Sequence, residues 1–197
     1  MSARFVVSQI LLGALLLSAA FAQKPKPAIE QSLAGLTVNH STLADARKLY
    51  GKEVREEFGA LIFAIGPDCK LGVTANKEGV IEILDLDLED ATKPPPYSAA
   101  CEAVATGSGL KFGGTREQVN QAFGLADSAA DPYGVYQFDN TAQCIGKPQK
   151  TPILYQLFWV KYSPENQHIL NIRVLGRKTT CGDGDIQMTI SDEGEGL

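Results

Sequence analysis

Two short stretches of the chain, residues 35–51 and 109–124, place apolar side chains with the period of a helix. The apolar positions, spaced i, i+3 and i+4, are Ala46, Leu49 and Tyr50 in the first stretch and Val119, Ala122 and Phe123 in the second. This spacing brings each trio to one face of a helix. The two stretches therefore predict two short amphipathic helices, and their similarity indicates an internal repeat.

Both predicted helices carry residues that can satisfy their ends. A threonine precedes each pattern, a side chain with an acceptor oxygen follows three residues later, and a glycine ends the pattern. The six capping residues are Thr42, Asp45 and Gly51 for the first helix and Thr115, Gln118 and Gly124 for the second. The arrangement is typical of capping boxes and glycine C-caps, with Asp45 as a shorter version of the usual Glu or Gln. We interpret these residues as structural.

Strand-like segments follow each predicted helix. They cover 59–66, 69–77 and 79–89 after the first helix and 133–138, 153–163 and 168–178 after the second. In each half a short turn joins the last two segments, as in antiparallel hairpins. We therefore expect an α+β fold of two tandem units, in each of which a short capped helix packs on an antiparallel β-meander.

The connector Lys93–Pro96 contains three consecutive prolines, which are incompatible with a helix interior and set the boundary between the units. We assign residues 23–92 to the first unit and 93–108 to a Pro-rich linker that returns as an extended segment. Residues 109–182 form the second unit. An acidic tail, 183–197, contains one predicted edge strand at 186–190.

The first 22 residues have the pattern of a secretory signal peptide. Arg4 is followed by an apolar run and by the small-x-small cleavage site Ala20-Phe21-Ala22. The alternative is a membrane anchor, but the run is short for a span and lacks a cationic stop. No cysteine stands at the cleavage site for lipid attachment. We expect cleavage after Ala22 and a periplasmic or secreted protein that is not inserted in the membrane.

The formal net charge of the chain is −5. Because lysine and arginine are not clustered, the chain does not have the basic patches that attract phosphate backbones or anionic lipids. We therefore expect no nucleic-acid partner.

Four cysteines, Cys69, Cys101, Cys144 and Cys181, follow the predicted cleavage site. An even number behind a signal peptide favours disulfides, and the absence of a C-x-x-C motif disfavours zinc. Three pairings are open on count alone. Within the repeat, Cys69 corresponds to Cys144 and Cys101 to Cys181, which favours the bonds Cys69–Cys101 and Cys144–Cys181.

The segment "GGTREQVNQAFG" resembles the G-x-[ST]-x-x-x-V-x-x-x-x-G signature of the β-lactamase-inhibitor-protein-like superfamily, with Gly113, Thr115, Val119 and Gly124 as the matching residues. The first copy departs from it, since Ala46 replaces the valine. The superfamily also includes the small lipoprotein of the outer-membrane barrel-assembly machine. The resemblance implies tandem helix-plus-sheet units, each with its own disulfide, and a bacterial protein that binds another protein as an inhibitor or an envelope-assembly factor.

Few residues of the sequence have a pattern that suggests catalysis. Asp85 and Asp87 share one face of a predicted strand and could serve as paired acid–base groups. The alternating leucines between them instead favour a solvated sheet face, which is our interpretation. We interpret the hydroxyls beside His40 as helix caps and His168 as a surface residue. The acidic residues 183–195 lack the ligand spacing of a calcium loop. We predict no catalytic, cofactor-binding or metal-binding residue and no enzyme activity.

Aromatic residues are concentrated on the strands of the second unit. In residues 154–162, Tyr155 and Trp159 fall on one face of the predicted strand and Phe158 falls on the other. One of these two faces is expected to be core. The other face is either a platform for a protein partner, with Tyr133, Tyr136, Tyr155 and Trp159 as its binding residues, or a second buried surface. Three hypotheses follow: a binding module, a small hydrolase using Asp85 and Asp87, and a structural envelope protein.

Overall fold

The computed structural model describes residues 30–124, 128–130, 133–138, 152–165 and 168–180. The predicted signal peptide, the tail at 183–197 with its strand at 186–190, Cys144 and Cys181 lie outside these residues. The helices are α1 (Leu43–Tyr50), α2 (Ala99–Ala103) and α3 (Arg116–Phe123). A two-residue hairpin pairs β1 (Ser32–Leu33) with β2 (Leu36–Thr37).

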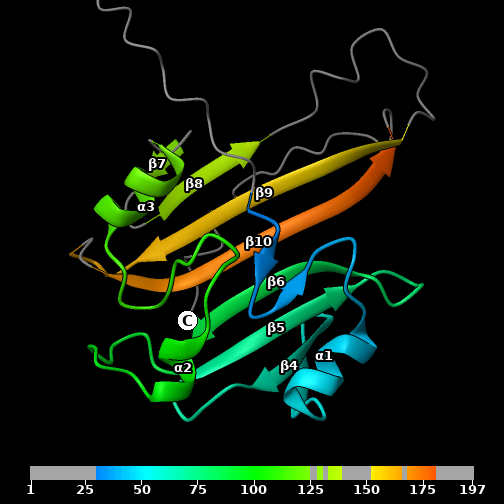
Figure 1. Ribbon diagram of the computed structural model, residues 1–197, viewed down its shortest axis with the longest axis horizontal. Helices are drawn as coiled ribbons and strands as arrows, with labels where there is room; N and C mark the ends of the chain where they lie inside the picture. Colours follow the sequence, from blue (N-terminus) through cyan, green and yellow to red (C-terminus); the bar gives the residue numbers. More distant parts are fainter. Residues whose placement is uncertain (1–29, 125–127, 131–132, 139–151, 166–167, 181–197) are drawn as a thin grey trace, which may run out of the picture.

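The remaining strands form one antiparallel sheet of eight strands, in the order β3-β4-β5-β6-β10-β9-β8-β7 (Figure 1). They are β3 (Arg55–Glu57), β4 (Ala60–Ala64), β5 (Cys69–Ala75), β6 (Ile81–Leu88), β7 (Ser128–Ala130), β8 (Tyr133–Phe138), β9 (Pro152–Tyr162) and β10 (Ile169–Thr180). The α+β class and the antiparallel meander are thus as predicted from the sequence. The tandem duplication itself stays a prediction.

The two halves of the chain meet in the middle of this sheet. Strand β6 of the first half pairs with β10 of the second half, and Asp85 stands opposite Arg173 in the register. The sequence predicted a meander in each half, but it did not predict that strands of the two halves pair edge to edge. Because each meander ends on a strand with a free edge, joining the two edges gives the backbone groups of residues 83–87 and 171–175 a ladder to pair with.

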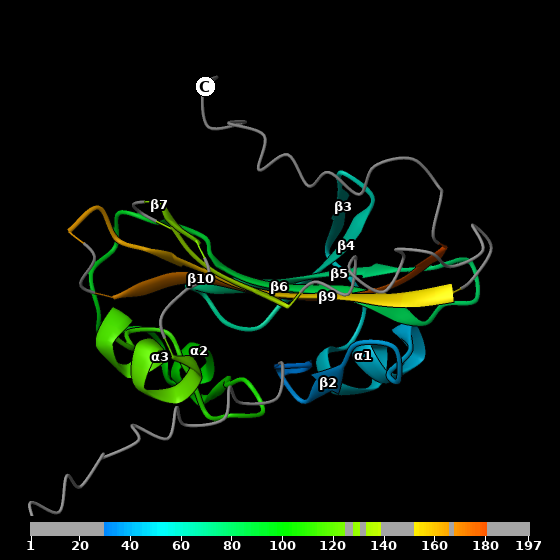
Figure 2. The same cartoon turned by 90° about the horizontal axis from the view of Figure 1, so that it is seen from above.

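All three helices and the β1–β2 hairpin lie on one side of the sheet (Figure 2). The core lies between these two layers, because alternate side chains of each strand point to the same side. From the sheet it contains the buried residues Phe63, Leu71, Val73, Leu84, Leu86, Leu88, Phe158, Val160, Tyr162, Ile172 and Val174. From the helices it receives Ala46, Val119 and Phe123.

The helices are short and their ends are satisfied by side chains. The Thr42 hydroxyl accepts from the backbone N–H of Asp45, and the Asp45 carboxylate accepts from the N–H of Thr42. The same reciprocal pair joins Thr115 and Gln118 at α3. Since an eight-residue helix is marginal alone, the caps and the docked apolar face must together hold it.

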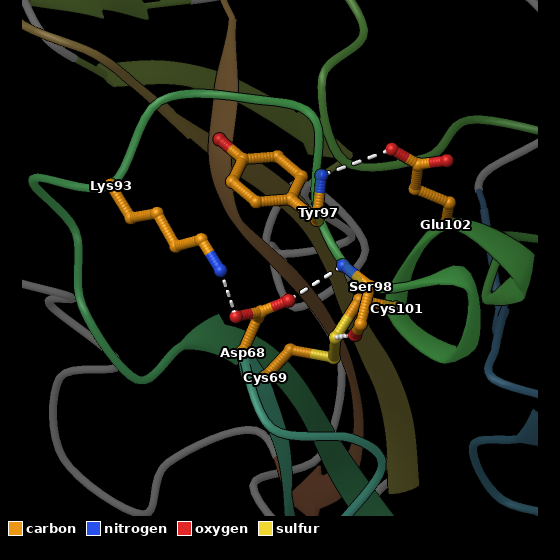
Figure 3. The surroundings of a disulfide bond; sticks show 7 residues. All are labelled: Asp68, Cys69, Lys93, Tyr97, Ser98, Cys101 and Glu102. Carbon is orange, nitrogen blue, oxygen red and sulfur yellow. Dashed lines mark hydrogen bonds and ion pairs between the residues drawn. A yellow bond between two sulfur atoms is a disulfide. The ribbon is translucent and has the colours of Figure 1, made fainter.

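The linker differs from the predicted extended segment, because residues 99–103 form the helix α2. Three interactions hold it (Figure 3). The Glu102 carboxylate accepts from the backbone N–H of Tyr97 at 3.0 Å, and the Asp68 carboxylate accepts from the N–H of Ser98 at 2.6 Å. Asp68 also forms an ion pair with Lys93. The alanine-rich sequence favours a helix, and these contacts fix where it begins.

A disulfide joins Cys101 of α2 to Cys69 at the start of β5, which confirms this predicted pairing. Both cysteines are buried, at 0 % and 1 % exposure. The bond and the Asp68 contacts lie side by side and attach the linker to the sheet (Figure 3). The predicted bond Cys144–Cys181 lies outside the described residues and stays a prediction.

We expect the double substitution of Cys69 and Cys101 by alanine to lower the free energy of unfolding by about 3–4 kcal/mol. The reason is that the bond closes a loop with a sequence separation of 32 residues, which constrains the unfolded chain. Urea denaturation of the variant and the wild type measures the difference. A loss below about 1 kcal/mol would contradict this role, and peptide mapping without reduction provides the control for the pairing.

Candidate functional site

The face of the sheet opposite the helices is the candidate site, and we call it the open face. Its side chains alternate with the core residues of the central strands. They are Lys70 on β5; Asp85 and Asp87 on β6; Tyr155, Leu157, Trp159 and Lys161 on β9; and Asn171, Arg173, Leu175 and Arg177 on β10. The period of two residues therefore puts charged and aromatic groups on a face backed by the core.

A row of three paired residues crosses the middle of the open face. Arg173 is the register partner of Asp85 on one side and of Trp159 on the other. Its Nε donates to Asp85 Oδ2 at 3.0 Å, and its Nη2 donates to the same oxygen. Its guanidinium carbon lies 5.2 Å from the centre of the Trp159 ring, within the range of a cation–π contact. The Arg173 side chain is still 43 % exposed, so this row is accessible.

The second carboxylate of β6 has a different environment. Burial raises the pKa of Asp87, and the neighbouring charge of Asp85 adds to that effect. Lys70, Asn171 and Lys161 act in the opposite direction. Asp87 is therefore a carboxyl group held near another carboxylate and without an arginine partner of its own.

Asn171 lies next to both carboxylates at the junction of the halves. It is the register partner of Asp87, and its Nδ2 donates to Asp85 Oδ1 at 2.6 Å. The residue is 4 % exposed, and its Oδ1 is buried without a hydrogen-bond partner. A buried acceptor without a hydrogen-bond partner lowers the stability of the fold, and such unfavourable groups are common at functional surfaces. Asp85 and Asp87 thus differ from the predicted solvated face, because both are half-buried in this polar cluster.

Beside the charged row, the open face has a small apolar cluster. Tyr155 and Leu157 are 3 % and 2 % exposed, and the half-buried Trp159 and Leu175 pack against them. Tyr155 and Trp159 share a face, as predicted, while Phe158 belongs to the core. Tyr155 is almost completely buried, however, so it is not the accessible binding residue that the sequence predicted. Tyr133 and Tyr136 lie on β8, paired in the backbone register with Lys161 and Phe158; their side chains lie outside the described part.

The first half of the sheet carries a network of ion pairs. Arg55 is 2.5 Å from Glu57 and 3.6 Å from Glu89, and Lys70 is 3.8 Å and 3.9 Å from the same two carboxylates. Arg55 and Glu89 are exposed, and Glu57 and Lys70 are half-buried. Ion pairs near the surface contribute little to stability individually. Their effect is to balance charge over β3 and β5.

The other candidate residues of the sequence have structural roles. Ser41 Oγ accepts from the backbone N–H of Thr37 at 2.9 Å, and Thr42 caps α1. His168 precedes β10, and its backbone N–H donates to Ser163 Oγ at 3.4 Å. Among the described residues, no group of three or more His, Cys, Asp or Glu side chains could hold a metal ion. The acidic residues 183–195 lie outside that part of the chain.

Sequence reasoning missed Asn171 and Arg173. Their alternation with Ile172 and Val174 could have placed them on a polar strand face. No local signal could have placed them opposite Asp85, because the pairing partners are 86 and 88 residues apart.

Comparisons with known proteins give only distant similarity. No family model and no curated protein matches the chain. A solved structure of a DUF4309 family protein from Bacillus subtilis has a TM-score of 0.41 and 13 % identity, over 73 % of this chain and 83 % of that one. A cysteine-rich secretory protein from Staphylococcus aureus has a TM-score of 0.41 and 14 % identity, over 77 % of this chain. The match covers 47 % of that protein.

We expect Asp87→Asn and Asp85→Asn to have opposite effects on stability. Because burial raises the pKa of Asp87, the folded protein binds this proton more tightly than the unfolded chain does. The ionised group therefore costs stability at neutral pH, and the cost disappears as the pH falls toward the ordinary carboxyl value of 3.8. Asp87→Asn should be more stable than the wild type at pH 7 and should lose this advantage in acid.

Asp85→Asn is the matched control, since it removes the charge that faces Arg173. It should be less stable than the wild type at pH 7 by about 1 kcal/mol. Thermal or urea unfolding from pH 4 to pH 7 measures both variants. Equal losses for the two substitutions would show that the environments of these carboxylates do not differ.

Proposed function

We propose that this protein is an exported binding module without catalytic activity, and that its open face docks a protein partner. The observation that carries the proposal is the row Asp85–Arg173–Trp159 at the centre of that face. Tryptophan and arginine are the residue types most enriched at the centres of protein interfaces. Here they are stacked, held by a carboxylate and still in part accessible.

The rigidity of the row also supports binding. Strands β10 and β9 are paired on both sides, and their opposite face is core. The side chains of the row are thus positioned before a partner arrives, which reduces the ordering cost of association. The resemblance of "GGTREQVNQAFG" to the inhibitor-like superfamily is consistent with such a role, either as an enzyme inhibitor or as an envelope-assembly factor.

Export is supported by the disulfide, because such bonds persist in oxidising compartments. In the described part of the chain, no helix is long and apolar enough to cross a membrane. We propose the periplasm or the external medium as the location.

A hydrolase that uses Asp85 and Asp87 is the second proposal. It is favoured by the raised pKa of Asp87, which is the property required of a general acid. It is weakened by Asp85, whose carboxylate already accepts from Arg173 and Asn171. A purely structural role is weakened by the way the halves join, since they meet edge to edge at β6 and β10 and do not stack their aromatic faces.

Site-specific photocrosslinking in the exporting cell tests the binding proposal. The photoreactive residue p-benzoylphenylalanine replaces Ile83, which is half-buried on the open face beside Leu175, or Gln121, which is exposed on α3 on the other side of the sheet. We expect one dominant protein adduct from position 83, reduced at least about tenfold by Trp159→Ala, because loss of a central hot-spot residue costs about 2 kcal/mol or more.

The control is position 121, which should give no such adduct. Circular dichroism and gel filtration establish that the Trp159→Ala protein is folded, and Arg173→Gln provides a second variant of the row. Equal adducts from positions 83 and 121, or an adduct that neither variant reduces, would contradict docking on the open face.

A further inference from the structure

Charge is distributed unevenly over the open face. The side chains that β9 and β10 present there within residues 155–161 and 171–177 include three cations, Lys161, Arg173 and Arg177, and no carboxylate. The strands of the first half present four carboxylates, Glu57, Asp85, Asp87 and Glu89, with the two cations Arg55 and Lys70. In a chain with a net charge of −5, the β9–β10 part of the open face is thus locally basic.

Arg173 has binding capacity beyond its contact with Asp85. That contact uses Nε and Nη2. A guanidinium group has five N–H donors, so the Nη1 side of Arg173 can receive a second carboxylate. The Arg173 side chain as a whole is 43 % exposed. Arg177 is exposed as well, two positions further along the same face.

Apolar side chains alternate with these cations along β10. On the open face the strand reads Arg173, Leu175, Arg177, and the register places Trp159, Leu157 and Tyr155 beside them in turn. Neighbouring positions on one strand face are about 6.8 Å apart, and an extended peptide repeats its own side chains at the same interval. The spacing of β10 therefore matches an extended segment whose acidic and apolar residues alternate at every second position.

We propose that the partner docks on β9 and β10 through an extended acidic segment with the pattern acidic–x–apolar–x–acidic. The two carboxylates pair with Arg173 and Arg177, and the apolar residue between them packs on the half-buried Leu175. This inference rests on the proposed function and names the chemistry of the partner. Free polyanions satisfy the cations but bring nothing to the apolar positions, so a protein segment fits this surface better than a phosphate polymer does.

Fluorescence anisotropy with labelled peptides and the full mature chain tests the pattern. The first peptide carries Glu-Ser-Leu-Ser-Glu between glycines, the second has the same composition with its two glutamates adjacent, and the third has lysines in place of the glutamates. We expect the first to bind at least about fivefold more tightly than the second and the third not to bind. Raising the salt from about 50 to 200 mM should weaken binding severalfold, because exposed charge pairs are screened.

Matched arginine variants locate the site. Arg173→Gln and Arg177→Gln should each weaken the first peptide about tenfold, since each removes one charge-assisted pair. Arg47→Gln is the control, because Arg47 is on α1 and its partner is Glu53. Equal binding of the scrambled or lysine peptide, equal binding of inorganic polyphosphate, or equal loss in Arg47→Gln would overturn the inference.

The peptide-binding experiment and the crosslinking experiment test different claims and can fail independently. If position 83 gives a partner adduct that the first peptide does not compete away, the acidic pattern is wrong while docking on the open face stands. If the peptide binds as described and no adduct forms in the cell, the acidic site stands and the proposed cellular function is wrong.

Discussion

The pairing of β6 with β10 is the contact on which the rest of the structure depends. It makes one sheet of two meanders, and through it the carboxylates of the first half meet Asn171 and Arg173 of the second. Without this pairing, Asp85 and Arg173 would stand on separate edges and the row that includes Trp159 would not exist. The candidate site is therefore a property of the joined sheet and of neither half alone.

The helices cover only one face of the sheet, which explains why one face is apolar core and the other carries polar and aromatic groups. The three short helices and the small hairpin of the described residues suffice to bury one face, because α1 and α3 begin with capping boxes and α2 is held by a disulfide and by Asp68. The other face is then available for polar and aromatic groups. Its groups are nevertheless not simply solvated: Asp87 is half-buried and Asn171 is almost completely buried, so this face keeps polar atoms in positions that stability alone does not favour.

The parts of this structure that could be predicted from the sequence are those set by local patterns. The spacing of Thr42 and Asp45 predicted the start of α1, and alternation predicted that Tyr155 and Trp159 share a face opposite Phe158. The helix α2 was missed because the alanines of residues 99–103 follow three prolines, and the contacts of Asp68 and Glu102 that hold the helix are visible only in three dimensions. Of the candidate site, Trp159 could be named from the sequence as a binding residue and Asp85 and Asp87 as neighbours on one strand face, but Arg173 could not be placed opposite Asp85. A register across 88 residues is decided by tertiary packing and leaves no local trace.

The disulfide has a consequence for how the chain reaches this structure if it is exported as we propose. Both of its cysteines precede residue 102, so in that case the bond can form while the second half is still crossing the membrane. The segment emerging first would then already hold β4, β5 and β6 as a covalently stabilised template, with β6 as an open edge. An open edge in a crowded compartment is prone to pair with another chain. The interval until β10 arrives is thus the stage of biogenesis at which this protein is most exposed to misassembly.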